Sequence, residues 1–140
     1  MKRLLTVLVA LAISMAATIG TATAAPKTRV QTVATPAQAA AIITSYTGES
    51  FPALTRHLAH GHLAVPGFGD PFEQCAALEA GIDFGDGEVF QLTYPYTFYG
   101  DVATEMPPGW PLLTANNRRQ CAIALYTYHH LAPYFFGEDA

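Results

Sequence analysis

The chain has 140 residues, of which 51% are hydrophobic and 13% are charged, and its formal net charge is −4. This length allows a single domain, and the high hydrophobic and low charged fractions exclude an intrinsically disordered protein. The acidic balance argues against nucleic-acid binding, which needs clustered lysine and arginine side chains to neutralise phosphates.

The N-terminus has the three parts of a secretory signal peptide. Lys2 and Arg3 supply positive charge, residues 4–19 are almost wholly apolar, and Ala22 and Ala24 place small side chains before a cleavage point. The apolar run is shorter than the roughly 20 residues of a spanning helix. We therefore expect removal of a signal peptide over residues 1–24, a secreted or periplasmic location, and no stable membrane insertion of the remaining chain.

Residues 25–34 are polar and irregular, which indicates a flexible segment ahead of a single globular domain over residues 35–140. The domain is expected to begin with a helix over residues 37–47. Thr35 supplies a capping hydroxyl, a proline follows at the first helical position, and Gly48 is a suitable stop.

Two further helices are predicted before the middle of the chain. A short one is expected over residues 52–60, where a serine and a proline repeat the start signal. The strongest local signal is Asp70-Pro71-Phe72-Glu73, in which Asp70 can cap, Pro71 takes the first helical position and Glu73 completes a capping box. This helix is expected to end near Ala80, before a glycine.

The period of the sequence then changes from helical to alternating. Apolar residues at every second position up to Phe98 predict a half-buried strand, and a β-hairpin is expected over residues 82–98. Asp83, Asp86 and Glu88 lie in its glycine-containing turn. Their oxygens could suit calcium, but a hairpin turn is the commoner reason for this composition.

A proline-rich loop is expected over residues 105–112, followed by a long helix over residues 115–131. Thr114 is expected to cap this helix and Pro133 to end it. Cys121 shares one face of the helix with Leu125 and Tyr128. That face is expected to pack on the helix that carries Cys75.

The two cysteines, Cys75 and Cys121, allow one intramolecular disulfide, which an exported protein would form in an oxidising compartment. The sequence therefore predicts an α+β fold: three to four helices packed with one β-hairpin and held by a Cys75–Cys121 disulfide.

Histidine is the conspicuous side chain for chemistry. Five histidines lie in two groups, His57, His60 and His62, then His129 and His130. Neutral imidazoles suit Zn and Cu, so the first group, with the second as a source of further ligands, is a candidate transition-metal site. A helix end decorated with histidine is the alternative interpretation.

Among the clustered aromatic residues, Tyr99 and Trp110 fall outside the strand alternation, so we expect them to be exposed and to contact a protein or glycan partner. No catalytic residue is predicted, because no nucleophile lies in an activating motif. The favoured function is a small exported, non-enzymatic accessory or binding protein. The alternatives are a histidine-based metal-binding protein and a small hydrolase that uses carboxylate and histidine groups.

Overall fold

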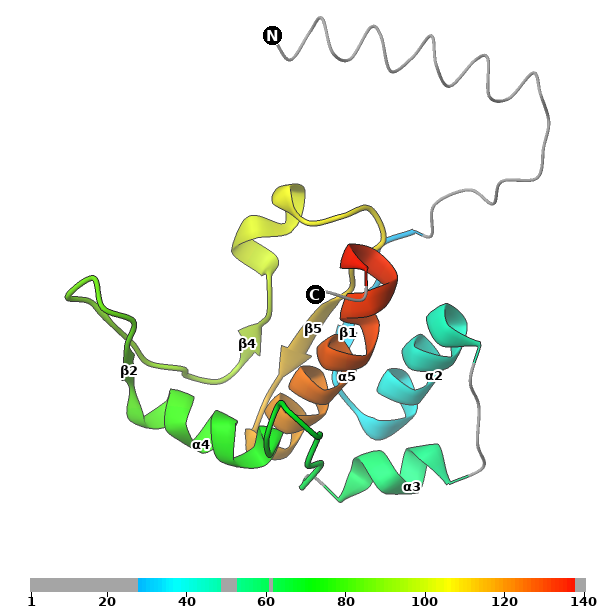
Figure 1. Ribbon diagram of the computed structural model, residues 1–140, viewed down its shortest axis with the longest axis horizontal. Coiled ribbons are helices and arrows are strands. Elements are labelled where there is room, and N and C mark those ends of the chain that lie inside the picture. The colour runs from blue at the N-terminus through cyan, green and yellow to red at the C-terminus, as the bar shows by residue number, and fades with distance from the viewer. Residues whose placement is uncertain (1–27, 49–52, 61, 138–140) are drawn as a thin grey trace, which may run out of the picture.

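The computed structural model describes residues 28–48, 53–60 and 62–137, and these form a mixed α+β domain, as the sequence predicts. The strands β1 (Gln31–Val33), β5 (Leu112–Ala115) and β4 (Tyr96–Thr97) make a sheet in the order β1-β5-β4. β1 runs parallel to β5, and β4 runs antiparallel to it. The central strand β5 thus lies between β1 and β4, two strands that are far apart from each other in the sequence (Figure 1).

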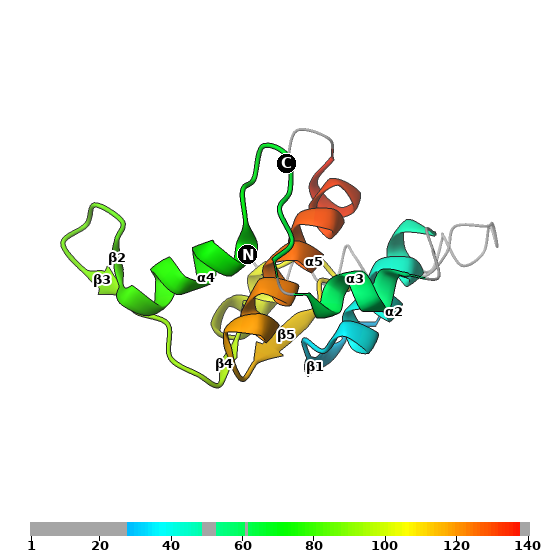
Figure 2. The same ribbon diagram turned by 90° about the horizontal axis from the view of Figure 1, so that it is seen from below.

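The long helix α5 (Arg118–Phe136) packs on β5 and contacts each of the other α-helices. Helix α4 (Pro71–Ala80) lies along one side of it, and helix α2 (Pro36–Thr47) lies along the other. Helix α3 (Leu54–Ala59) packs beside α2 (Figure 2). The core therefore surrounds α5, whose residues from Cys121 to Ala124 are all fully buried.

The caps predicted for α2 and α4, Thr35 and Asp70, are confirmed by the structure, while the capping-box role of Glu73 stays a prediction. The Thr35 hydroxyl accepts a hydrogen bond from the backbone amide of Gln38, and Gly48 ends α2 with a left-handed φ of 74°. The Asp70 carboxylate accepts a hydrogen bond from the amide of Phe72 at the start of α4. These side chains satisfy backbone amides that a helix leaves without an intrahelical partner.

The predicted hairpin forms only in its first half. Strands β2 (Ile82–Asp83) and β3 (Val89–Phe90) pair with each other and project beyond the end of α4 (Figure 2). Within the turn, carboxylate oxygens of Asp83 and Asp86 accept backbone hydrogen bonds, as in an ordinary polar turn. The rest of the predicted strand leaves the hairpin, because β2 begins directly after α4 and offers no partner beyond Phe90. Its later residues form β4, which pairs with β5.

Two expectations near the N-terminus of the domain and of α5 are wrong. The flexible segment expected over residues 25–34 includes β1, which pairs with β5 and so belongs to the domain. Thr114 lies in β5 and does not cap α5; the side chain of Asn117 does, by accepting from the amide of Gln120. The pairing of β1 with β5 places residues 31–33 in the sheet, and no signal in the neighbouring sequence predicts a partner so far along the chain.

Pro133 does not end α5, which continues to Phe136. A proline inside a helix removes one backbone hydrogen bond. Here the last turn is held by packing, because the ring of Phe135 lies 5.0 Å from the indole of Trp110 and 5.1 Å from the ring of Tyr46.

The predicted disulfide is confirmed. Cys75 of α4 and Cys121 of α5 are bonded and fully buried, with their Cα atoms 6.1 Å apart. The expected signal peptide, residues 1–24, lies outside the described residues. Within the described ranges, no helix is long and apolar enough to cross a membrane.

Loss of the disulfide should destabilise the domain strongly. The bond joins residues 46 positions apart, and the chain-entropy model gives about 4 kcal/mol for a loop of this length. We expect the Cys75→Ala/Cys121→Ala double variant to lose about 2–5 kcal/mol of unfolding free energy in urea titrations. Equal stability of the variant and the oxidised parent would contradict this, and the reduced parent is the control.

Candidate functional site

A pocket of about 830 Å³ opens beside the C-terminal half of α5. Its wall is formed by α5, by the loop before α4, and by the chain around the 3-10 helix η1 (Gly100–Glu105). In the described part of the chain, five phenylalanine, tyrosine and tryptophan side chains line it: Phe68, Tyr99, Trp110, Tyr128 and Phe136. The aromatic residues of three separate segments thus gather at one place.

Trp110 forms the centre of this aromatic wall. Its indole stacks on the ring of Tyr128, with centroids 5.2 Å apart and an interplanar angle of 15°, and meets the ring of Tyr99 edge-on at 5.6 Å. The expectation that Trp110 is exposed is wrong, because only 2% of its surface is accessible. The guanidinium of Arg29 donates to the Trp110 carbonyl at 2.8 Å, and this contact between distant segments holds the loop inward.

The indole N–H of Trp110 is a buried donor without an acceptor. It is the single buried side-chain nitrogen or oxygen in the described residues that forms no hydrogen bond. Burying a donor in this way costs about 1–3 kcal/mol. This cost is borne inside the aromatic cluster, where the N–H is closed off from the pocket.

Tyr128 connects the pocket to the sheet. Its hydroxyl accepts a hydrogen bond from the amide of Leu113 and donates one to the carbonyl of Pro111, both at 2.8 Å. Burial raises the pKa of Tyr128, so the phenol stays neutral and keeps its proton for the Pro111 carbonyl. One side chain of α5 thus fixes both β5 and the face of the pocket.

Tyr99 occupies the opposite edge of the wall, where it is half-buried. Its backbone φ is 64°, in the left-handed region that non-glycine residues rarely adopt. Its ring packs edge-on against Tyr128, with centroids 4.8 Å apart, and burial raises its pKa. The expectation of a fully exposed Tyr99 is therefore only partly met, while a role in partner binding stays a prediction.

The structure separates the first group of candidate metal ligands. The ring of His57 meets Tyr126 at 5.6 Å, whereas His62 lies 4.3 Å from the ring of Phe72. A ring nitrogen of His62 is 3.3 Å from a carboxylate oxygen of Asp70. Burial opposes ionisation of Asp70, but hydrogen bonds from His62 and the Phe72 amide outweigh it and lower the Asp70 pKa. His60 ends α3 and is exposed.

The second group lies on α5. His130 packs against the same Tyr126 ring that His57 contacts, at 4.4 Å, so one histidine from each group meets this tyrosine. His129 packs on Phe68 and lines the pocket. Residues 28–48, 53–60 and 62–137 contain no group of three or more histidine, cysteine, aspartate or glutamate side chains that could hold a metal ion. The Zn or Cu site stays a prediction.

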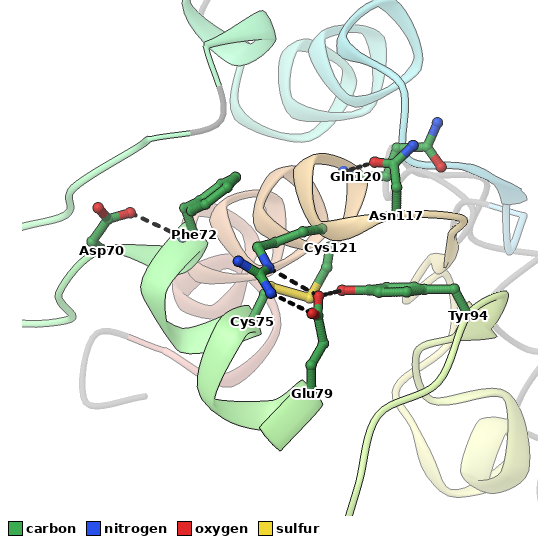
Figure 3. Close-up of a disulfide and its surroundings, with 9 residues drawn as sticks. Asp70, Phe72, Cys75, Glu79, Tyr94, Asn117, Gln120 and Cys121 are labelled. Atoms are coloured by element: carbon green, nitrogen blue, oxygen red, sulfur yellow. Dashed lines mark hydrogen bonds and ion pairs between the residues drawn. A yellow bond between two sulfur atoms is a disulfide. The ribbon is translucent and has the colours of Figure 1, made fainter. Parts of the chain in front are cut away.

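A polar cluster that the sequence did not reveal lies beside the disulfide (Figure 3). Two nitrogens of the Arg118 guanidinium donate to Glu79 at 2.5 and 3.1 Å, and the Tyr94 hydroxyl donates to the same carboxylate at 2.5 Å. The hydrogen bonds from Arg118, then that from Tyr94, lower the Glu79 pKa. These three residues join α4, α5 and the segment before β4, and no local sequence signal could have paired them.

Comparison of the chain with protein-family models, curated proteins and solved structures gives no match.

Replacing Tyr128 with phenylalanine should destabilise the protein, because it leaves the Leu113 amide and the Pro111 carbonyl without their partner. We expect Tyr128→Phe to lose about 2 kcal/mol of unfolding free energy in urea titrations. Tyr126→Phe, on the same helix, is the matched control and should lose less. A Tyr128→Phe variant as stable as the control would show that these hydrogen bonds add nothing.

The Glu79 cluster should stabilise the protein in a pH-dependent way. The Arg118 and Tyr94 hydrogen bonds hold the pKa of Glu79 in the folded protein below that of an ordinary glutamate. Its contribution to stability is therefore present above the ordinary pKa and is lost as pH falls through the folded-state pKa. We expect Glu79→Gln to lower the unfolding free energy at neutral pH, with the difference from the parent shrinking in acid. Glu105→Gln, at the exposed end of η1, is the control, and a pH-independent difference for Glu79→Gln would contradict the assignment.

Proposed function

We propose that this protein is a small exported binding protein whose aromatic pocket holds a small molecule with an apolar body. The observation that carries the proposal is the gathering of five aromatic side chains around one pocket of about 830 Å³. Ligand sites of proteins have volumes of roughly 300–1,000 Å³ and are lined mainly by apolar and aromatic side chains with a few polar groups. This pocket has that size and that composition.

Contacts with the rest of the protein hold the aromatic side chains of the wall in place. Tyr128 is held by two backbone hydrogen bonds, and Trp110 is held by stacking and by the Arg29 contact to its carbonyl. A preformed wall lowers the entropy lost when a ligand binds. The pocket is therefore suited to bind without large rearrangement.

Export is supported by the buried disulfide and by the signal-peptide pattern of the N-terminal sequence. Disulfides form and persist in oxidising compartments, whereas the cytosol keeps thiols reduced. A binding protein in the envelope or outside the cell accounts for both features.

The pocket favours binding over the hydrolase alternative. Hydrolysis by carboxylate and histidine needs at least two such groups that converge on a substrate. The described residues that line the pocket include His129 and no carboxylate. The pair of His62 and Asp70 involves an exposed histidine and a carboxylate that caps α4.

The proposal can be tested with N-phenyl-1-naphthylamine, a neutral dye that fluoresces in apolar sites. Trp110 is the only tryptophan in the chain, so changes in its emission report on the pocket wall. We expect saturable dye binding with one site per chain and a matching change in Trp110 emission.

A pair of variants makes this test specific. Ala132 lines the pocket, and Ala132→Phe should fill it and weaken dye binding at least about tenfold. Ala77, exposed on α4, provides the matched Ala77→Phe control, which should bind like the parent. No saturable binding by the parent, or equal binding by both variants, would refute the proposal.

A further inference from the structure

We propose that the ligand of this pocket is an aromatic carboxylic acid, and that the imidazole of His129 binds its carboxylate. The inference rests on the proposed function and extends it to a chemical class.

His129 is placed to meet a ligand in the pocket. It follows Tyr128 on α5, is half-buried, and lines the pocket. Its ring lies against Phe68, with centroids 4.7 Å apart and an interplanar angle of 33°. The Phe68 loop is itself held, because its backbone carbonyl accepts from the side-chain amide of Gln74 and its amide donates to the Val65 carbonyl. The packing against Phe68 therefore fixes the position of the His129 imidazole at the wall of the pocket.

The polar side-chain groups left to a ligand are the imidazole of His129 and the hydroxyl of Tyr99, and each can donate a hydrogen bond. The indole N–H of Trp110 is buried and does not reach the pocket. The hydroxyl of Tyr128 already bonds to the backbone. No described lining residue is a carboxylate. A ligand with an anionic oxygen acceptor fits this set, since hydrogen bonds to a carboxylate are stronger than those to a neutral oxygen.

The aromatic rings of the wall favour a ligand with a flat aromatic body. Aromatic pairs favour offset-stacked or edge-to-face contacts beyond the burial of apolar area. The wall already contains both arrangements, stacked for Trp110 on Tyr128 and edge-on for Tyr99. A flat aromatic body can therefore add a further ring to the cluster, with its carboxylate toward His129.

The test compares 1-naphthoate with 1-naphthamide, which has the same ring system and no charge. Binding is measured by Trp110 emission and by displacement of N-phenyl-1-naphthylamine. We expect the parent to bind 1-naphthoate about tenfold more tightly than 1-naphthamide. In His129→Leu this preference should disappear while the affinity for 1-naphthamide is retained.

Two further variants serve as controls for the role of His129. His129→Gln keeps a side-chain N–H donor and should retain part of the preference for 1-naphthoate. His60→Leu, at the exposed end of α3, removes a histidine that does not line the pocket and should bind both compounds like the parent. Thermal unfolding of each variant shows whether it is folded.

The outcomes separate this inference from the proposed function. Binding of the neutral dye without a preference for 1-naphthoate, or a preference that persists in His129→Leu, would overturn the inference and leave the proposed function standing. Absence of dye binding to the folded parent would overturn both. The preference in the parent, its loss in His129→Leu and its partial return in His129→Gln would together support the assignment.

Discussion

The buried Cys75–Cys121 disulfide is the constraint on which the arrangement around α5 depends. It fixes α4, and with it the projecting hairpin, against a helix that also packs on the sheet and on α2. The cluster of Glu79, Arg118 and Tyr94 lies beside the disulfide and extends this connection to the segment before β4. Covalent and polar contacts thus reinforce the same helix pair, which a small hydrophobic core would hold less firmly.

The pocket lies beside the C-terminal half of α5, whereas the disulfide lies near the N-terminal end of the helix. Contacts with the core hold the pocket wall in place. Tyr128 is both a hydrogen-bonded support of the chain entering β5 and a wall of the pocket. Trp110, just before β5, stacks on that tyrosine and is covered by Phe135 and Phe136. The residues that hold the fold together here are therefore the same residues that line the pocket. This overlap explains why so many aromatic side chains are placed in one small region.

The parts that could be predicted from the sequence are those governed by neighbouring residues. A capping side chain followed by proline predicted the starts of α2 and α4, because the cap and the amides it satisfies lie within three positions. The disulfide was predicted because two cysteines in a chain with a signal-peptide pattern leave a single pairing. The pocket could not be predicted, since the contact of Arg29 with Trp110 joins residues 81 positions apart. The position of Trp110 outside the strand alternation suggested exposure, whereas packing between distant segments buries it.

The sequence by itself determined the starts of α2 and α4, the pairing of the cysteines, the α+β class and the identity of the aromatic and histidine side chains. The tertiary structure alone decided that β1 joins β5, that Trp110 is buried, and that His129 lies at an aromatic pocket while His57 and His62 face different rings. The physical reason is the range of the interactions. Caps and turns are satisfied by hydrogen bonds between near neighbours, whereas strand pairing, burial and the walls of a pocket depend on which distant segments pack together.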